Sequence, residues 1–385
     1  MKIAVIGGGH AGVEAAAAAA AAGAEVDLFS NEGVLPYFRP RLIAVACGQS
    51  EPDATLMHPA EWYATKGIRV HLETPVMVFD PETRRVVCKA TDAAYAAVVL
   101  ACGSLPIIPK IDGWADGLPV MVLWTMREAL LLRNRITPGA RVLVIGGGVL
   151  GVETALRAAA AGAKPVVVER LPRLLSANVG ETAARLLHEQ VAAVGVDIRC
   201  NRSVLMFRSE AAGAVTAVLD DGSRVEADVA VCSIGASPNR TLAQAAGIET
   251  DRGVLIDAYL QTPWPGVFAA GDVAQLRGCG VRCSAREASL QGKIAGANAA
   301  ACATQRGLQP YTSPQPMLAL KVGAVEVYAA GEAGGGEAHR EERLDDGSLC
   351  RVCRLLVRRG DAVVGVQMVG SREGFDAACK HWSGQ

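Results

Sequence analysis

The hydrophobic pattern at the start of the chain predicts a strand, a helix and a second strand. Residues 3–6 are consecutive apolar residues, which is the length and type of a buried parallel strand. A helix-forming run from Val13 to Ala22 follows, and the stretch from Glu25 to Phe29 has the composition of the second strand. This order of elements predicts a βαβ unit.

Three glycines lie in the turn between the first strand and the helix. Gly7, Gly9 and Gly12 have the spacing GxGxxG. In this spacing the first glycine makes a tight turn, the second lets the backbone approach a pyrophosphate, and the third lets the helix pack against the strand. The phosphates then meet the positive end of the helix. The turn therefore predicts a dinucleotide-binding site.

The same pattern occurs a second time, with Val142 in the place of Ile3, 139 residues later. Residues 142–169 read VLVIGGGVLGVETALRAAAAGAKPVVVE and align with residues 3–30 without a gap. The three glycines of the first turn and Glu14 align with Gly146, Gly148, Gly151 and Glu153. A repeat that includes the flanking positions predicts two dinucleotide-binding units, one for a flavin and one for a nicotinamide.

Other apolar runs predict the elements that complete these units. The stretch from Tyr95 to Leu100 is an apolar strand that leads into Ala101-Cys102-Gly103, and residues 261–274 form a strand that ends at Gly271-Asp272. Residues 286–301 have the spacing of a helix. After the proline-rich stretch 309–316, the tail alternates strand-like runs, the first from Leu318 to Ala329, with Gly/Asp turns. The tail therefore predicts a small α+β domain.

Composition and charge narrow the class of protein. A chain of 385 residues is long enough for two or three domains with buried cores. The formal net charge of −1 argues against a nucleic-acid partner and a membrane surface, and no apolar run has the length of a membrane span. The alanine run 15–22 is a poor signal peptide, because Lys2 alone is a poor basic region and Glu14 lies inside the stretch.

The cysteines favour reduced thiols. They number 11, an odd count, and are scattered, which is typical of a cytoplasmic protein rather than of a disulfide framework. Cys350 and Cys353 have the spacing of a redox pair, but they lie in a strand-like run, where residues three apart point to opposite faces. Cys279 and Cys283 have no companion His or Cys pair, so we expect no metal site. We expect a cytoplasmic monomer or homodimer.

Four segments in this order resemble those of the FAD-dependent pyridine nucleotide-disulfide oxidoreductase superfamily. They are the two glycine turns, ACGSLPIIP at residues 101–109 and TPWPGVFAAGDVA at residues 262–274. The resemblance implies an α/β fold with two Rossmann-like domains, one for FAD and one for NAD, and a small C-terminal α+β domain. It implies an FAD domain at 1–113 and 236–308, an NAD domain at 114–235 and a C-terminal domain at 309–385.

The segment PYFRPRL at residues 36–42 indicates which group within the superfamily the chain resembles. It is similar to the PYxRPxL segment of NADH:rubredoxin and ferredoxin reductases and of the flavin portion of NADH-dependent nitrite reductases. Pro40 occupies the position at which NADH peroxidases carry a redox cysteine, and Cys47 lies about two helical turns later. The redox thiol is therefore expected to be missing. The lysine that often follows in ferredoxin reductases is also missing here, where the chain reads Leu42-Ile43-Ala44.

The resemblance and the motifs together predict the cofactor sites. We expect FAD to contact Gly7, Gly9, His10, Ala11, Gly12, Asn31, Glu32, Arg39, Pro40, Val76, Ala101, Cys102, Gly103, Gly271 and Asp272. We expect NAD to contact Gly146, Gly148, Gly151, Glu153, Glu169 and Gly235. The resemblance implies that Asp272 binds the flavin ribityl chain. The residues expected nearest the chemistry are Glu153, Pro40 and His10.

Several of these residues have alternative interpretations. Glu169 ends the second strand of its unit, where a carboxylate accepts hydrogen bonds from ribose hydroxyls and repels a 2′-phosphate, so NADH is favoured over NADPH. Ser30 occupies the matching place in the first unit, so Glu32 is predicted to bind the FAD ribose instead. Glu153 could simply be a helix N-terminal acid. Without a partner cysteine, His10 could be a helix-start residue beside FAD.

The predicted reaction is hydride transfer from C4 of NADH to N5 of FAD, followed by transfer of single electrons to a small carrier protein such as rubredoxin or ferredoxin. The arginines of residues 349–360 could dock an acidic carrier or could form a solvated face. Two alternatives stay open. The protein could be an NADH oxidase or peroxidase that uses Cys47 or the flavin alone, or a non-enzymatic NADH-responsive flavoprotein or complex subunit.

Overall fold

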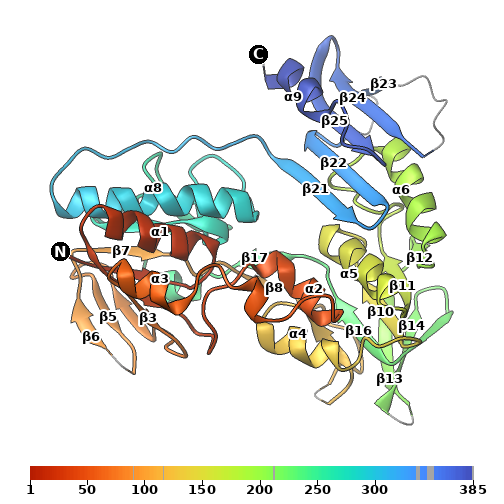
Figure 1. Ribbon diagram of the computed structural model, residues 1–385, viewed down its shortest axis with the longest axis horizontal. Coiled ribbons are helices and arrows are strands. Elements are labelled where there is room, and N and C mark those ends of the chain that lie inside the picture. Colours follow the sequence, from red (N-terminus) through yellow and green to blue (C-terminus); the bar gives the residue numbers. More distant parts are fainter. Residues whose placement is uncertain (90, 116, 211–212, 335–338, 345–350, 384–385) are drawn as a thin grey trace. The chain divides into compact units, whose positions relative to one another are not determined.

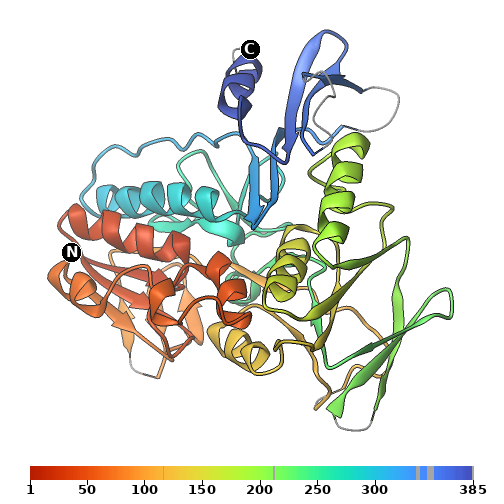
Figure 2. The same cartoon turned by 45° about the vertical axis from the view of Figure 1, so that its right-hand side comes forward.

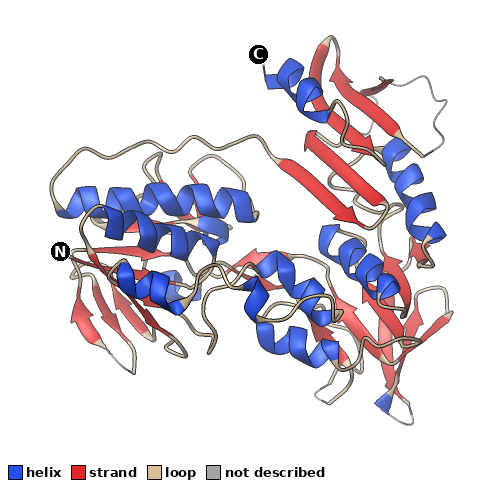
Figure 3. Cartoon of the chain, in the orientation of Figure 1, coloured by secondary structure: helices blue, strands red, loops and turns tan. Residues whose placement is uncertain are grey.

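The computed structural model describes residues 1–89, 91–115, 117–210, 213–334, 339–344 and 351–383 (Figures 1 and 2). Contacts within the chain divide it into two compact units. The first unit holds residues 1–42, 51–106 and 236–314, and the second holds residues 43–50, 107–235 and 315–385. Each unit contains both helices and strands (Figure 3).

A five-stranded parallel sheet forms the centre of the first unit, in the order β19-β7-β1-β2-β3. Its strands are β1 (Lys2–Ile6), β2 (Glu25–Phe29), β3 (Ile68–His71), β7 (Ala97–Leu100) and β19 (Val267–Ala269). The helix α1 (His10–Ala21) connects β1 to β2, so the predicted βαβ unit is confirmed. Most residues of these strands are apolar because the sheet is buried in the core of the unit.

Close packing of two helices explains the alanine-rich composition of the first unit. Helix α1 lies beside α8 (Ala285–Ala303), as Figures 1 and 2 both show. A Cβ on Gly292 would overlap the backbone of Ala11, and a Cβ on Gly296 would overlap the backbone of Ala15. The run that could be mistaken for a signal peptide therefore forms a helix whose small side chains let two backbones approach closely.

Shorter elements surround this sheet. The helices are α3 (Ala60–Thr65) and α7 (Thr241–Ala245), whereas α2 (Leu42–Ala46) belongs to the second unit except for its first residue. The strands are β4 (Val78–Asp80), β5 (Arg85–Val87), β6 (Asp92–Ala94), β8 (Ser104–Pro106), β17 (Ala236–Pro238), β18 (Val254–Ile256) and β20 (Ala274–Leu276). Strand β8 pairs with β17, and β18 pairs with β20.

A buried carboxylate fixes β2 from within the first unit. Asp27 is 1 % exposed, and its oxygens lie 2.7 Å from Lys2 Nζ, 2.9 Å from His71 Nε2 and 2.8 Å from the Tyr95 hydroxyl. Burial alone would raise the pKa of Asp27, but the hydrogen bonds from His71, Lys2 and Tyr95 outweigh it and lower the pKa. Asp27 therefore ties the strand to both of its neighbours and to the chain start.

The second unit contains the other repeat in a sheet of the same design. Its order is β12-β11-β10-β16-β9, and all neighbouring strands are parallel. The elements are β9 (Val120–Val122), α4 (Met126–Arg133), β10 (Arg141–Ile145), α5 (Val149–Ala160), β11 (Lys164–Glu169), α6 (Glu181–Ala193), β12 (Asp197–Cys200) and β16 (Val229–Cys232). An antiparallel meander precedes β16 and consists of β13 (Val204–Ser209), β14 (Val215–Leu219) and β15 (Arg224–Ala227).

The tail forms an antiparallel sheet with one helix, in the order β21-β22-β25-β24-β23. The elements are β21 (Met317–Val322), β22 (Val325–Gly331), β23 (Arg340–Arg343), β24 (Cys353–Arg359), β25 (Ala362–Val369) and α9 (Phe375–Ser383). The run predicted as one strand from Leu318 to Ala329 is a hairpin, because Gly323 has φ of +57° and turns the chain. The predicted α/β class with a C-terminal α+β domain is confirmed.

Candidate active site

The first glycine turn is a tight cradle. Gly7 has φ of +123°, and a Cβ there would overlap the carbonyl oxygen of Ala101. A Cβ on Gly12 would overlap the carbonyl oxygen of Gly7, so no larger residue allows this approach of helix and strand. A Cβ on Gly9 would meet no atom within 4 Å. The backbone at Gly9 therefore borders open space of the kind that a pyrophosphate would fill.

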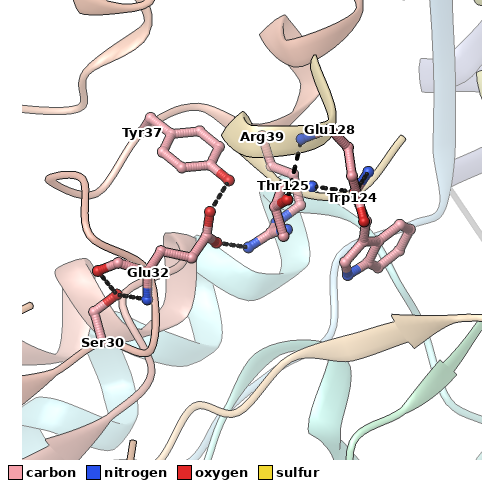
Figure 4. A network of polar contacts seen from close by, with 7 residues as sticks. All are labelled: Ser30, Glu32, Tyr37, Arg39, Trp124, Thr125 and Glu128. Atoms are coloured by element: carbon pink, nitrogen blue, oxygen red, sulfur yellow. Dashed lines mark hydrogen bonds and ion pairs between the residues drawn. The ribbon is translucent and has the colours of Figure 1, made fainter. Parts of the chain in front are cut away.

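The helices that follow the two glycine turns have no side-chain cap. The N-cap residues of α1 and α5 are Gly9 and Gly148, and neither helix start receives a side-chain hydrogen bond. Helix α4 differs, because the Glu128 carboxylate accepts a 2.8 Å hydrogen bond from the N–H of Thr125 and the Thr125 hydroxyl accepts one from the N–H of Glu128 (Figure 4). Uncapped N–H groups at a helix start attract anions. The starts of α1 and α5 therefore fit the phosphates of two dinucleotides.

A polar group follows β2 in the first unit. The Ser30 hydroxyl accepts a 3.2 Å hydrogen bond from the N–H of Glu32. The Glu32 carboxylate accepts hydrogen bonds from the Tyr37 hydroxyl at 2.7 Å and from the Arg39 guanidinium at 3.1 Å (Figure 4). The structure thus brings together Glu32 and Arg39, two of the residues predicted for FAD, while Asn31 is exposed beside them.

Asp272 follows β19 in a short 3-10 helix (Gly271–Val273) whose first residue, Gly271, has φ of +78°. Oδ2 of Asp272 accepts a 2.7 Å hydrogen bond from the Ser104 hydroxyl. Burial raises the pKa of Asp272, against the opposing effects of the Ser104 hydrogen bond and the Arg39 charge. A half-buried carboxylate, with about four lone-pair sites, fits a polyol chain, which needs polar partners when buried.

The residues after β7 lie against the first turn. Ala101 is buried, and its carbonyl oxygen lies beside Gly7. The Cys102 thiol contacts the carbonyl oxygen of Ile6 at 3.7 Å, and burial raises its pKa to about 12. Gly103 has φ of +65°, and its carbonyl accepts a 2.9 Å hydrogen bond from Asn239. Cys102 is therefore a protonated thiol that packs against β1, and its predicted contact with FAD stays a prediction.

The second glycine turn repeats the geometry of the first. Gly146 has φ of +110°, and a Cβ there would overlap the carbonyl oxygen of Ser233. A Cβ on Gly151 would overlap the carbonyl oxygen of Gly146, whereas a Cβ on Gly148 would meet nothing within 4 Å. The Ser233 hydroxyl is buried and has no hydrogen-bond partner among the described residues. An orphaned donor at the end of β16 fits a polar ligand beside this turn.

Glu169 braces the second turn. Its carboxylate accepts hydrogen bonds from the backbone N–H of Gly147 and, at 2.7 Å, from that of Leu171. Arg170 is exposed. A carboxylate has about four lone-pair sites, so two remain for ribose hydroxyls. Gly235, predicted at the same edge, is exposed with φ of +120°.

Glu153 forms an ion pair within α5. Its carboxylate lies 2.8 Å from Arg157 Nε, and Arg157 also donates a 3.0 Å hydrogen bond to Gln49. The positive charge of Arg157 balances the negative charge of Glu153. The role predicted for Glu153 near the nicotinamide stays a prediction.

The three residues that bear on a thiol mechanism have distinct environments. Pro40 is exposed in a 3-10 helix (Arg39–Arg41). His10 begins α1 with its ring 5.7 Å from that of Phe38, and its pKa is lowered by burial and by the Arg39 charge. Cys47 is buried directly after α2, and burial raises its pKa to about 12. The thiol nearest in sequence to the expected redox position is therefore protonated.

The other candidates lie apart from these turns in the sequence. Val76, predicted to meet the adenine of FAD, lies half-buried between β3 and β4. Cys279 and Cys283 are exposed, Cys353 is buried, and Cys350 lies outside the described residues. The described cysteines are all free, and no group of three or more His, Cys, Asp or Glu in the described residues could hold a metal.

Three of the four arginines proposed for docking form ion pairs. Arg354 contacts Glu373 at 2.7 Å, and Arg358 and Arg359 form ion pairs with Glu342 and Glu332. This pairing favours the solvated face over a docking surface for an acidic carrier. No helix in the described parts of the chain has the length and apolar character that crossing a membrane requires.

Sequence reasoning missed Ser104 and Ser233. Ser104 directly follows the ACG segment, and Ser233 follows the last strand of the second parallel sheet. Each could have been found by asking which hydroxyl lies within four residues after the strand beside each glycine turn.

Two parallel sheets, each with a glycine cradle and an uncapped helix start, define a protein that binds two dinucleotides. The chain belongs to the pyridine nucleotide-disulphide oxidoreductase family, whose model matches residues 1–303. It is therefore an FAD-dependent NAD(P)H oxidoreductase, and the residues described above fit both cofactors.

Curated relatives and solved structures agree with this family. The chain is 32% identical over 281 residues to rubredoxin-NAD(+) reductase of Ectopseudomonas oleovorans, which covers 72% of this chain and 73% of that protein. It is 31% identical over 394 residues to the biphenyl dioxygenase system ferredoxin–NAD(+) reductase component of Paraburkholderia xenovorans, covering 97% and 94%.

Among solved structures, the covalent putidaredoxin reductase–putidaredoxin complex has a TM-score of 0.87 at 24% identity, covering 98% of this chain and 92% of that chain. The water-forming NADH oxidase from Lactobacillus brevis has a TM-score of 0.86 at 22% identity, covering 99% and 89%. At these identities both likenesses show the fold alone.

Proposed function

We propose that this protein transfers electrons from NADH through FAD to a small carrier protein of the rubredoxin or ferredoxin type. Relatives above 30% identity carry the names rubredoxin-NAD(+) reductase and ferredoxin–NAD(+) reductase component. The segment at residues 36–42 supports the same group.

The observation that carries the proposal is the environment of Pro40 and Cys47. A disulfide reductase or peroxidase of this family needs a reactive thiol beside the flavin. Here the expected position holds an exposed proline, and Cys47 is buried with a pKa of about 12. Because the thiolate is the reactive form, a protonated buried thiol is a poor relay. The electrons are therefore expected to leave without a sulfur step.

The chain's own residues would bind and orient the two cofactors. Bound FAD would supply the chemistry, which is acceptance of a hydride and release of single electrons. Gly7, Gly9 and the start of α1 would hold its pyrophosphate, and Asp272 its ribityl chain. Glu32 with Arg39 would hold its adenosine end.

NADH would occupy the second turn. Gly146, Gly148 and the start of α5 would hold the pyrophosphate, and Glu169 would accept hydrogen bonds from the ribose and disfavour NADPH. Domain limits of 1–113 with 236–308 for FAD, 114–235 for NAD and 309–385 for the C-terminal domain go with this assignment. The free thiols and the use of NADH support a cytoplasmic location.

A panel of acceptors tests the proposal. The purified FAD-loaded protein is mixed with NADH or NADPH and with rubredoxin, a [2Fe–2S] ferredoxin, oxygen, hydrogen peroxide, nitrite or a disulfide. We expect fast NADH-dependent reduction of an iron carrier and slow turnover with oxygen, peroxide and disulfides. Fast turnover with oxygen or peroxide would identify an oxidase or peroxidase instead. Slow flavin bleaching by NADH would identify an NADH-responsive flavoprotein.

A further inference from the structure

A buried carboxylate at the start of α8 takes no part in the cofactor contacts described above. Glu287 is 4 % exposed. Its Oε1 accepts hydrogen bonds from the Tyr311 hydroxyl at 2.5 Å and from the Ser313 hydroxyl at 2.8 Å. Gln291, one turn later on α8, lies with Nε2 3.4 Å from the same oxygen. A charge this deeply buried is stable only when several donors satisfy it, so the cluster fixes its members.

The cluster reaches the turn that carries Asp272. Oε1 of Gln291 accepts a 2.8 Å hydrogen bond from the backbone N–H of Gly271, and Gln291 is 5 % exposed. An amide whose nitrogen is turned toward Glu287 must present its oxygen to Gly271. Glu287 therefore selects the orientation in which Gln291 can hold the Gly271 N–H.

Gly271 needs this support. Its φ of +78° is one that few residues adopt, and its Cα lies close to α1, since a Cβ there would lie 2.8 Å from the Cβ of Ala11. A turn in this conformation keeps its place only while its surroundings hold it. The hydrogen bond that Gly271 donates to Gln291 fixes the residue before Asp272, and thereby the direction of the Asp272 carboxylate.

The segment that leads to the C-terminal domain closes over the cluster. The hydroxyl groups of Tyr311 and Ser313 in this segment bind Glu287. Arg282 also holds the segment, because it donates hydrogen bonds to the Ser313 hydroxyl at 3.0 Å and to the carbonyl of Pro314 at 2.9 Å. Tyr311 is 8 % exposed. Residues 311–314 therefore form a strap, bound at both ends, over the carboxylate that orients Gln291.

We propose that Glu287 is a positioning residue for FAD, which acts through Gln291 on the Gly271–Asp272 turn and requires the strap of residues 311–314 in place. The proposal rests on FAD binding at Asp272, and it holds whichever acceptor the protein uses.

The test measures how fast the holoprotein releases FAD when excess apoflavodoxin traps the free flavin. We expect Glu287→Ala and Gln291→Ala each to speed release about tenfold, since one buried hydrogen bond at the turn is lost. The double variant should release FAD as fast as either single variant, because both changes break one connection. The visible circular dichroism of bound FAD should change in the same way in all three.

Matched variants separate positioning from general stability. Glu249→Gln removes an exposed acid paired with Arg277 in the same unit and should leave FAD release unchanged. Glu287→Gln keeps an oxygen that accepts from Tyr311 and Ser313, so it should restore release to within about threefold of the parent. Tyr311→Phe removes one donor from Glu287 and should speed release by less than the tenfold expected for Glu287→Ala. This variant keeps the test open if Glu287→Ala does not fold.

Two results would overturn the proposal. One is FAD release and visible circular dichroism that stay as in the parent while Glu287→Ala lowers the melting temperature. The other is a double variant whose effect equals the product of the single effects, since Glu287 would then act independently of Gln291. Neither result depends on reduction of a carrier, so either is distinguishable from failure of the proposed function.

Discussion

Replacement of Cys47 by alanine tests the absence of a thiol relay most directly. Cys47 is 5 % exposed, follows α2 and precedes Gly48. Alanine is preferable to serine because a serine hydroxyl would need a hydrogen-bond partner at a buried position. Alanine removes one sulfur atom from the core, and we expect a loss of about 1 kcal/mol in the free energy of unfolding.

The expected effect on chemistry follows from the pKa. With a pKa of about 12, the fraction of Cys47 present as thiolate at pH 7 is about 10⁻⁵. An ordinary exposed thiol is about a thousand times richer in thiolate. A step that needs this thiolate would be slowed by about the same factor. The proposed path avoids the step, so Cys47→Ala should oxidise NADH with an iron carrier at the parent rate, within about twofold.

Two measurements together check this reasoning. The first is steady-state NADH oxidation by the parent and the alanine variant with a carrier and with hydrogen peroxide. The second is alkylation of the native protein by iodoacetamide at pH 7, followed by peptide mass analysis, with exposed Cys279 as the internal control. Cys279 should react readily and Cys47 should not. Rapid labelling of Cys47, or loss of most of the turnover in the alanine variant, would refute the reasoning.

Four further substitutions test the two turns and the core. Gly9→Ala should fold normally but bind FAD at least tenfold more weakly, and Gly148→Ala should retain FAD but show a raised Kd for NADH. In each case the added Cβ enters open space that a pyrophosphate needs. Equilibrium titration of each variant with its cofactor checks both outcomes. Glu169→Ala should raise KM for NADH and reduce the preference for NADH over NADPH, since the variant loses two hydrogen bonds to the backbone and a negative charge. An unchanged ratio of kcat/KM for NADH to kcat/KM for NADPH would contradict the assignment. Asp27→Asn should cost about 3 kcal/mol of stability at pH 7 in urea unfolding. Because the folded pKa of Asp27 is lowered, its contribution is full above the unfolded value near 4 and disappears as the pH falls through the folded pKa, so the difference from the parent should shrink in acid.

The sequence predicted the parts of the fold that depend on local chemistry. The apolar runs and the two glycine spacings are confirmed as elements, because strand and helix periods and a tight turn depend on neighbouring residues. The strand predicted over residues 261–274 is much shorter in the structure, where β19 covers Val267–Ala269. The Leu318–Ala329 run was predicted wrongly as one strand, since a single glycine, Gly323, reverses the chain without any break in the apolar pattern.

The partners of the candidate site were harder to predict. The side chains of Ser104 and Asp272 meet at 2.7 Å although the two residues lie 168 positions apart in the chain. No local sequence pattern could therefore have predicted this contact. The ion pair between Glu153 and Arg157 could have been predicted from the spacing of four residues on a helix, which would have shown that Glu153 has a local partner. Glu287 gave no signal, because its burial depends on Tyr311 and Ser313.

The two glycine turns have the same backbone geometry but different supports, and this difference bears on how each ligand exchanges. Each turn contacts a strand end distant in the sequence, the first at Ala101 and the second at Ser233, and Glu169 braces the second at Gly147. In the first unit, α1 also packs against the Gly271 turn, which Gln291 and the strap fix. Release of a ligand from the first turn is therefore expected to require movement of this additional distant segment, which the second turn lacks among the described contacts. Slow exchange at the first turn suits a resident FAD, and fast exchange at the second suits NADH, which must leave after each turnover.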